Sequence, residues 1–297
     1  MAEINRQRVN LPLGVLLFAI AMLLQATVGG LVKEGGPSIS VAEFIFVQSV
    51  ICWILCLPQA LRGGFKMIKT SRLGLILTRA LTGLVAFFLL YLSFHHIPMV
   101  EGMLLMNTAP IWIPIVLLIW KRQNSPIAVW LAVILGFIGV ACVIGRPTNL
   151  VNLYAPLALV SGIGLAIVII CLRDLTKTET SEKILFYYFL LLSLATLGPV
   201  LEQWAHGVTH ISVTGWTCMV VSGFVMYGCQ MTLNHGMRFG TPHVLGPLIY
   251  LSPVFSGIID WIFWHHVPHV MTFVGTALVI IAGILSIRLG SPKPAKV

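Results

Sequence analysis

Three ionisable side chains, Arg79, Glu101 and Asp260, lie within or at the start of apolar runs of this chain. A charge near the centre of an apolar helix costs about 3 kcal/mol on insertion scales, so such a residue is a candidate for function. Arg79 could bind a carboxylate or a phosphate as a bidentate fork. Asp260 and Glu101 could each carry a proton.

Each of these charges also has a structural interpretation. Arg79 follows Arg72 by only about 10 Å of helix, so its side chain could snorkel to the membrane surface. Glu101 falls in the first turn of its helix, where an acid stabilises the helix dipole. Asp260 could be solvated at the membrane interface beside Trp264. Both interpretations of each residue stay open at this point.

Uncharged polar side chains extend the set of candidates. Gly223, Tyr227, Gln230 and Asn234 recur at helical spacing and therefore share one face. Buried amides often act only as bonds between helices, but a whole face of them suits the wall of a substrate cavity. The candidate substrate-binding residues are Gln25, Gln48, Arg79, Asn107, Trp112, Tyr227, Gln230 and Tyr250.

No metal site or cofactor site is predicted from the sequence. All six cysteines lie in apolar runs and are interpreted as small core residues. His265, His266 and His269 could bind a metal or sense pH. They also suit outer loops, which avoid Lys and Arg and can use histidine as a neutral polar residue. Nothing resembles a nucleotide-binding loop, so direct coupling to ATP is not expected.

The composition is that of a membrane protein. The chain is 58% hydrophobic and 9% charged, with a mean hydropathy of +0.98, against roughly 25% charged residues in soluble domains. The lipid bilayer is thus an expected partner. The net charge of +9 comes from basic residues in short loops, which set orientation in a membrane, so no nucleic acid partner is expected.

Apolar stretches of about 20 residues predict ten membrane-spanning helices in a single membrane domain, an all-α polytopic fold. The predicted spans are residues 11–32, 41–61, 73–95, 98–120, 127–145, 154–172, 183–203, 212–234, 242–264 and 269–289. With the N-terminus inside, fifteen Lys and Arg residues are cytoplasmic and two, Lys33 and Arg146, are outside. The positive-inside rule therefore predicts that both termini are cytoplasmic.

Two segments of the chain are weak copies of one another at an offset of 143 residues. In residues 91–145 and 234–288, Pro110 matches Pro253 without a gap. The predicted repeats, 11–145 and 154–289, each hold five spans, an odd number, so they must be inverted relative to each other. Inverted repeats are typical of secondary transporters. The paired prolines predict gating hinges in the fourth and ninth spans.

Small residues also recur in the fifth and tenth spans. Gly136 and Gly139 lie in the fifth span, and Gly275, Ala282 and Gly283 lie in the tenth. Such residues let helix backbones approach closely. These faces could pack against each other within the chain or could form a homodimer.

The chain resembles the EamA-type family of the drug/metabolite transporter superfamily. Leu77-Thr-Arg-Ala-Leu-Thr-Gly83 is similar to the family's third span, and Ile97-Pro-Met-Val-Glu-Gly102 to its fourth. Relatives often carry Gly-Glu just after the fourth and ninth spans. Here those places fall near Arg122 and His265.

The resemblance implies a secondary transporter in the bacterial cytoplasmic membrane that moves a small polar or amphipathic metabolite by alternating access. An amino acid or an amino-acid derivative is the expected substrate, with coupling to protons or by exchange. A multidrug exporter is one alternative. A membrane-embedded enzyme is another, but clustered catalytic groups such as an HExxH pair or an Asp dyad do not occur in the sequence.

Overall fold

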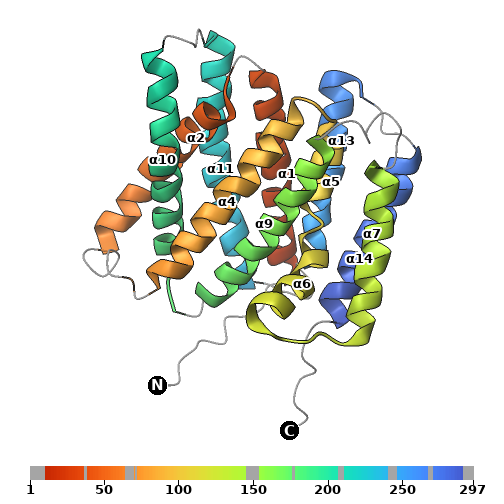
Figure 1. Cartoon of the computed structure of the whole chain (residues 1–297). Coiled ribbons are helices and arrows are strands. Elements are labelled where there is room, and N and C mark those ends of the chain that lie inside the picture. Colours follow the sequence, from red (N-terminus) through yellow and green to blue (C-terminus); the bar gives the residue numbers. More distant parts are fainter. Residues whose placement is uncertain are drawn as a thin grey trace.

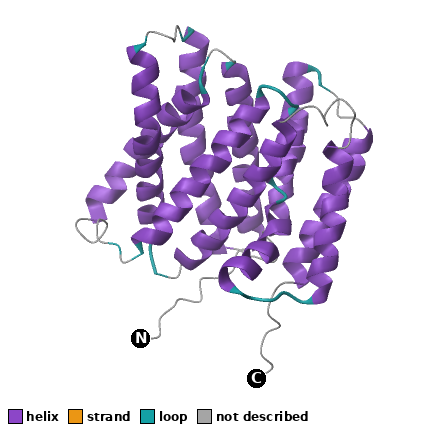
Figure 2. Ribbon diagram, in the orientation of Figure 1, coloured by secondary structure: helices purple, strands orange, loops and turns teal. Residues whose placement is uncertain are grey.

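The computed structural model describes residues 11–36, 39–63, 70, 72–144, 154–175, 178–206, 211–239, 246–266 and 270–289. Within these ranges the chain forms helices and loops without a strand (Figure 2). The first half contains α1 (Leu11–Gly35), α2 (Val41–Gly63), α4 (Leu73–Phe94), α5 (Met99–Met106), α6 (Ala109–Lys121) and α7 (Ile127–Ile144). The second half contains α9 (Tyr154–Leu175), α10 (Ser181–Ala205), α11 (Val213–Phe239), the 3₁₀ helix η1 (Gly246–Tyr250), α13 (Leu251–Trp264) and α14 (Val270–Leu289).

Six helical stretches are long and apolar enough to cross a membrane. They are Pro12–Gly35, Val41–Leu61, Leu73–Phe94, Met99–Lys121, Tyr154–Leu175 and Ser181–Ala205. Three shorter apolar helices are Ile127–Cys142, Leu248–Trp264 and Val270–Leu285. The helix α11 is 27 residues long but more polar. Large apolar side chains on the outer surface, such as Leu131 and Phe263, are more than 60% exposed, as expected of helices that face lipid.

The helices form one bundle with two helix pairs at its flanks (Figure 1). The pair α2 and α10 packs at one flank, and the pair α7 and α14 packs at the other. We call the end of the bundle where α1 begins and α14 ends the near end, and the opposite end the far end. The helix α1 packs against α11 and α13, whereas α9 packs against α4 and α6.

The fourth predicted span is broken into two helices. The helix α5 ends at Met106 and α6 begins at Ala109, so the helical run is interrupted at Asn107 and Thr108. The prolines of this run predicted a kink, a hinge or a break into two half-helices. The break precedes Pro110, which lies in the first turn of α6. There its missing N–H costs no helical hydrogen bond.

The ninth predicted span has the same form. The 3₁₀ helix η1 ends at Tyr250 and α13 begins at Leu251, with Pro253 in its first turn. The residue before α6 has φ −71° and ψ −3°, and the residue before α13 has φ −74° and ψ −4°. Both half-helices then end on a left-handed residue, Arg122 with φ 50° and His265 with φ 51°, and 122 + 143 = 265.

Two further pairs of helices have described bounds at the same offset. The helix α1 is described from Leu11 and α9 from Tyr154, and 11 + 143 = 154. The helix α7 starts at Ile127 and α14 is described from Val270, and 127 + 143 = 270. The offset shortens to 140 residues between the starts of α2 and α10, at Val41 and Ser181.

Small residues bring α7 and α14 into close contact. A Cβ added at Gly139 would lie 2.9 Å from the backbone oxygen of Gly275. A Cβ at Gly136 would lie 3.2 Å from the Cβ of Ala282. Hence the small-residue faces of the fifth and tenth predicted spans meet each other within this chain, which is the first of the two arrangements that the sequence allows.

Candidate functional site

Arg79, predicted to lie within the third span, is buried in the described structure. Its side chain on α4 is 4% exposed, and its guanidinium carbon lies 4.4 Å from the ring centroid of Tyr188 on α10. Gly83, one turn further along α4, leaves room for that ring, because a Cβ there would lie 3.0 Å from it. The guanidinium thus points into the bundle and lies over an aromatic face, a favourable place for a cation.

Arg79 lacks a counter-charge among the residues that the structure describes. No carboxylate of the described residues forms an ion pair with it, and its Nε atom is buried without a hydrogen-bond partner. A buried charge is normally paired, because removing it from water costs several kcal/mol. The guanidinium is therefore a buried cation without a counter-charge among the described residues.

A small cavity with a mixed polar and apolar lining adjoins the same tyrosine. It has a volume of about 10 Å³ and lies between α2, α4, α10 and α11, with Gln48, Ser49, Tyr188 and Gln230 as its polar lining. The Oε1 atom of Gln48 accepts a hydrogen bond from the Tyr91 hydroxyl at 3.1 Å. Its Nε2 atom is buried without a partner. This space is the size of about one water molecule.

Two unpartnered donors therefore border Tyr188. They are Arg79 Nε from α4 and Gln48 Nε2 from α2. Buried donors are satisfied in the great majority of cases, so each exception asks for an explanation. A carboxylate is an acceptor only and can accept several such bonds. Gln48 lines the small cavity and Arg79 does not, so the cavity itself reaches only one of the two donors.

Other predicted site residues lie along α1 and α11. The Tyr227 hydroxyl accepts a hydrogen bond from Gln59 Nε2 at 3.4 Å. The Oε1 atom of Gln25 accepts one from the thiol of Cys229 at 3.5 Å. These contacts place both predicted residues where α11 meets α2 and α1. Of the predicted set, only Gln48 and Gln230 line the small cavity directly.

Three predicted residues serve the broken helices and their neighbours. The Asn107 Nδ2 atom donates to the Met103 carbonyl oxygen at 2.9 Å, at the break between α5 and α6. Trp112 donates from Nε1 to the Thr108 hydroxyl at 3.1 Å. Tyr250 packs its ring against α14, where Gly283 leaves space for it. The structure brings none of these three to the cavity beside Tyr188.

The two carboxylates predicted to carry protons lie at the far end. Asp260 is fully buried and accepts from Lys33 Nζ at 2.5 Å and from the backbone N–H of Val100 at 3.0 Å. Glu101, 3% exposed, accepts from the Thr272 hydroxyl at 3.4 Å. These contacts tie α13 to α1 and α5, and α14 to α5.

Lys33 was expected in an outer loop, after a span ending at residue 32. The structure instead continues α1 through Gly35, and Gly36 stops it with φ +79°. Lys33 therefore stands in the last turn of the helix, where it faces Asp260, and its ammonium lies 4.3 Å from the ring centroid of Trp264. The pair Gly35-Gly36 is the sequence signal that could have extended the helix.

Histidines also gather at the far end. Burial, followed by the neighbouring His96, lowers the pKa of His95 below its usual range, so the imidazole stays neutral near pH 7. His96 stacks on Tyr154, with 3.6 Å between the ring centroids. Of the predicted metal or pH site, His269 lies outside the described residues, and the described residues contain no group of three or more metal-binding side chains.

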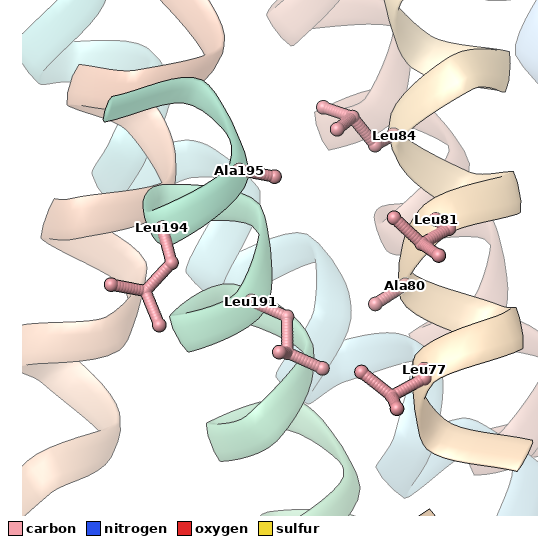
Figure 3. Close-up of a pocket in the computed structure, with 7 residues that line it drawn as sticks. All are labelled: Leu77, Ala80, Leu81, Leu84, Leu191, Leu194 and Ala195. Atoms are coloured by element: carbon pink, nitrogen blue, oxygen red, sulfur yellow. The ribbon is translucent and has the colours of Figure 1, made fainter. Parts of the chain in front are cut away.

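A second, larger cavity lies away from these polar groups. It has a volume of about 260 Å³ and is formed by α4 and α10. Figure 3 shows its lining of leucine and alanine from the two helices. Leu81 and Leu194 are each 57% exposed, so the groove opens on the outer apolar surface. It offers no polar group to a substrate and is the kind of surface that lipid covers.

Long apolar helices with an apolar outer surface and buried polar groups define an integral membrane protein. The family model of the EamA-like transporter family matches residues 12–145 and again residues 152–288. The chain therefore belongs to the EamA-like transporter family, as its resemblance predicted. It is a membrane transporter of small molecules and not an enzyme.

Several proteins of known function are similar to the chain over most of its length. The pseudopaline exporter CntI of Pseudomonas aeruginosa is 25% identical, over 91% of this chain and 94% of the exporter. A riboflavin transporter of Brucella anthropi is 24% identical, over 87% of this chain and 91% of that protein. One solved crystal structure shares the fold, with a TM-score of 0.64 and 16% identity, covering 93% of this chain and 98% of its own.

Proposed function

We propose that this protein is a secondary transporter that moves a small carboxylate-bearing metabolite by alternating access. The observation that carries the proposal is the buried guanidinium of Arg79, which lies over Tyr188 without a carboxylate among the described residues. A substrate anion would supply the missing charge. The amides of Gln48 and Gln230 would then bind its polar groups.

An amino acid or an amino-acid derivative is the substrate class that fits this site best. Its carboxylate suits the guanidinium, and its remaining polar atoms suit two amides that can donate and accept. The relatives named for pseudopaline and riboflavin are consistent with a small polar or amphipathic cargo. In this proposal Tyr227 and Gln25 bound the same space from α11 and α1, while Asn107, Trp112 and Tyr250 contact the substrate after the broken helices move.

The proposed architecture is ten spans in two inverted repeats, 11–145 and 154–289, within the cytoplasmic membrane. The left-handed residues that end α6 and α13, Arg122 and His265, lie 143 residues apart. With five spans in each half, the two copies have opposite directions in the bilayer. The bias of fifteen basic residues against two supports cytoplasmic termini, and the near end would then face the cytoplasm.

Alternating access requires the cavity to enlarge, because 10 Å³ is too small for a metabolite. The proposed hinges are the breaks before α6 and α13, at Pro110 and Pro253. Replacing Pro253 with Ala would let α13 extend toward η1 and should slow transport several-fold by shifting the balance between states. If a folded Pro253→Ala protein transported substrate in vesicles as fast as wild type, Pro253 would shape the helix without acting as a hinge.

Proton coupling is assigned in this proposal to Asp260 and, second, to Glu101. Protonation of Asp260 would remove the charge that holds Lys33. Transport would then respond to a pH gradient in wild type and lose that response in Asp260→Asn. If transport by Asp260→Asn still responded to the pH gradient, coupling would have to occur through Glu101 or by exchange of substrates.

The test of the substrate site is a thermal-shift experiment on the purified protein in detergent. Amino acids and related carboxylates are compared with their methyl esters, which keep the size but lose the charge. A ligand at 100 times its dissociation constant adds about 2.7 kcal/mol to folded-state stability. We expect the acids to raise the melting point and the esters to leave it unchanged.

Variants locate the effect at Arg79. Arg79→Gln should remove the shift, and Arg79→Lys should weaken binding about tenfold or more, since a point charge does not replace the planar fork. Arg72→Gln, which removes an exposed arginine at the start of the same helix, is the matched control and should respond as wild type. Equal shifts with acids and esters, or a full response in Arg79→Gln, would contradict the proposal.

A further inference from the structure

Two ion pairs join helix ends at opposite ends of the bundle. At the far end Lys33 of α1 pairs with Asp260 of α13, with 2.5 Å between Nζ and Oδ1. At the near end Lys121 of α6 pairs with Asp174 of α9, with 2.5 Å between Nζ and Oδ2. No other described ion pair joins the C-terminal ends of two helices.

The helices joined by these pairs correspond to each other. The helices α1 and α9 are the first helices of the two segments that match the family model, 12–145 and 152–288, and α6 and α13 end at Lys121 and Trp264, where 121 + 143 = 264. Each pair therefore joins the first helix of one half to the second half-helix of the broken span in the other half. The charges are reversed, since the lysine comes from α1 at the far end and from α6 at the near end.

A further contact supports this correspondence. Trp264 occupies the place in α13 that Lys121 occupies in α6, and its ring lies 4.3 Å below the Lys33 ammonium. Asp260, which receives that ammonium, precedes Trp264 by one helical turn. The two contact regions thus lie at the same turn of their helices, with different side chains.

We propose that these pairs are two ionic gates, one for each side of the membrane, and that transport opens them one at a time. The proposal rests on the proposed function, because alternating access needs one closed end in every state. Lys33 and Asp260 close the far end. Lys121 and Asp174 close the near end.

Both ion pairs are formed in this structure, and the small cavity between α2, α4, α10 and α11 has a volume of about 10 Å³. In this proposal the structure corresponds to an occluded state, with both gates closed. Opening a gate would separate α1 from α13 at the far end or α9 from α6 at the near end. Each separation would break helix contacts at one end of the bundle and leave the contacts at the other end intact.

The gates differ in strength. The side chains of Lys33 and Asp260 are 17% and 0% exposed, and Asp260 also accepts from the Val100 backbone. The side chains of Lys121 and Asp174 are 32% and 22% exposed. Salt screens exposed pairs much more than buried ones. The near-end gate should therefore open more readily, and more so at high ionic strength.

The test measures access to the cavity from each side of the membrane. In a variant whose six cysteines are replaced by Ala, a single reporter cysteine replaces Met226, which lines the cavity. Vesicles of both orientations are treated with a membrane-impermeant charged maleimide, and the labelling rate is measured. Asp260→Asn should raise labelling from the far end by about tenfold, and Asp174→Asn should raise it from the near end by a smaller factor of about three.

Matched controls separate gating from a loss of charge or of folding. Glu34→Gln removes an exposed acid one residue after Lys33 and should leave labelling unchanged. Exchanging the charges, with Lys33→Asp and Asp260→Lys together, should restore the labelling of the parent, whereas Lys33→Asp alone should open the far end.

The proposal fails if the two single variants label alike from both sides, or if Glu34→Gln opens the far end as Asp260→Asn does. The readout uses no substrate. A wrong substrate class in the proposed function would therefore leave the labelling pattern intact, and a uniform labelling pattern would leave binding at Arg79 intact.

Discussion

The bundle holds two cations that lie against aromatic rings, and they differ in what else they touch. The Lys33 ammonium is 4.3 Å from the ring centroid of Trp264 and also pairs with Asp260. The Arg79 guanidinium is 4.4 Å from the ring centroid of Tyr188, but no described carboxylate joins it. The contacts with the rings are nearly equal, so the counter-charge is the difference.

That difference separates a charge used inside the protein from one available to a ligand. A paired cation is satisfied by its own chain, and its removal harms the fold. An unpaired buried cation lowers stability in itself, so its presence indicates a role outside stability. The two residues should therefore respond in opposite directions when the charge is removed.

Lys33→Met should produce the largest change. It leaves Asp260 fully buried without its cation, and breaking a buried pair in this way costs about 3 kcal/mol at the lower end of the usual range. The melting point in detergent should fall accordingly. The double variant Lys33→Met with Asp260→Leu should recover most of the loss. If Lys33→Met were as stable as wild type, the ion pair would contribute nothing to the free energy of unfolding.

Arg79→Met should raise stability instead. It removes an unpaired buried charge, at the expense of a cation–π contact of about 1 kcal/mol, and the net gain should be about 1 kcal/mol. The melting point without ligand should rise, while the ligand-induced shift disappears. A marked loss of stability would mean that Arg79 has a structural partner and that the comparison with Lys33 is wrong.

The rings themselves should matter least. Tyr188→Leu should lower the affinity for a carboxylate ligand by roughly fivefold, because the ring helps hold the guanidinium in place. Trp264→Leu should have a smaller effect on the far-end gate, since Lys33 keeps Asp260. Ligand titration of the first variant and reporter labelling of the second measure the two effects. If Trp264→Leu changed labelling as much as Tyr188→Leu changed affinity, the rings and not the counter-charge would determine how the two cations behave.

Much of this fold follows from hydropathy and turn residues. Apolar runs of about 20 residues gave the helices, and the matched prolines gave the correct positions of both broken helices. The paired prolines predicted hinges or half-helix breaks, but a proline signals an altered helix without saying on which of its sides the helix is interrupted. The structure places the break before Pro110 and Pro253, at Asn107 and Tyr250.

The candidate site was only partly accessible from the sequence. Arg79, Gln48 and Gln230 are polar residues in apolar runs, so the cost of burial singles them out. Tyr188 carries no such cost and looks like any core aromatic residue. Lys33 was misplaced because helix ends depend on capping contacts beyond the apolar run. Which helices meet, as α4 meets α10 at Arg79, is decided by packing between distant parts of the chain.

The two left-handed residues that end α6 and α13 have a practical consequence. Arg122 and His265 adopt a backbone conformation that costs a residue with a side chain about 1–2 kcal/mol. They stand near the places where relatives often carry the glycine of Gly-Glu. Glycine would relieve the strain. It also has more conformational entropy in the unfolded chain, and this lowers the free energy of unfolding by about 0.5–1 kcal/mol, which offsets part of the gain.

Each replacement, Arg122→Gly or His265→Gly, should therefore gain about 0.5 kcal/mol. Melting of the two variants and of their combination checks this, and a loss of stability would show that the side chains themselves stabilise the helix ends. Both positions are distant from the cavity beside Tyr188. Substitution at these two positions could therefore increase thermal stability for purification and crystallisation without changing ligand binding.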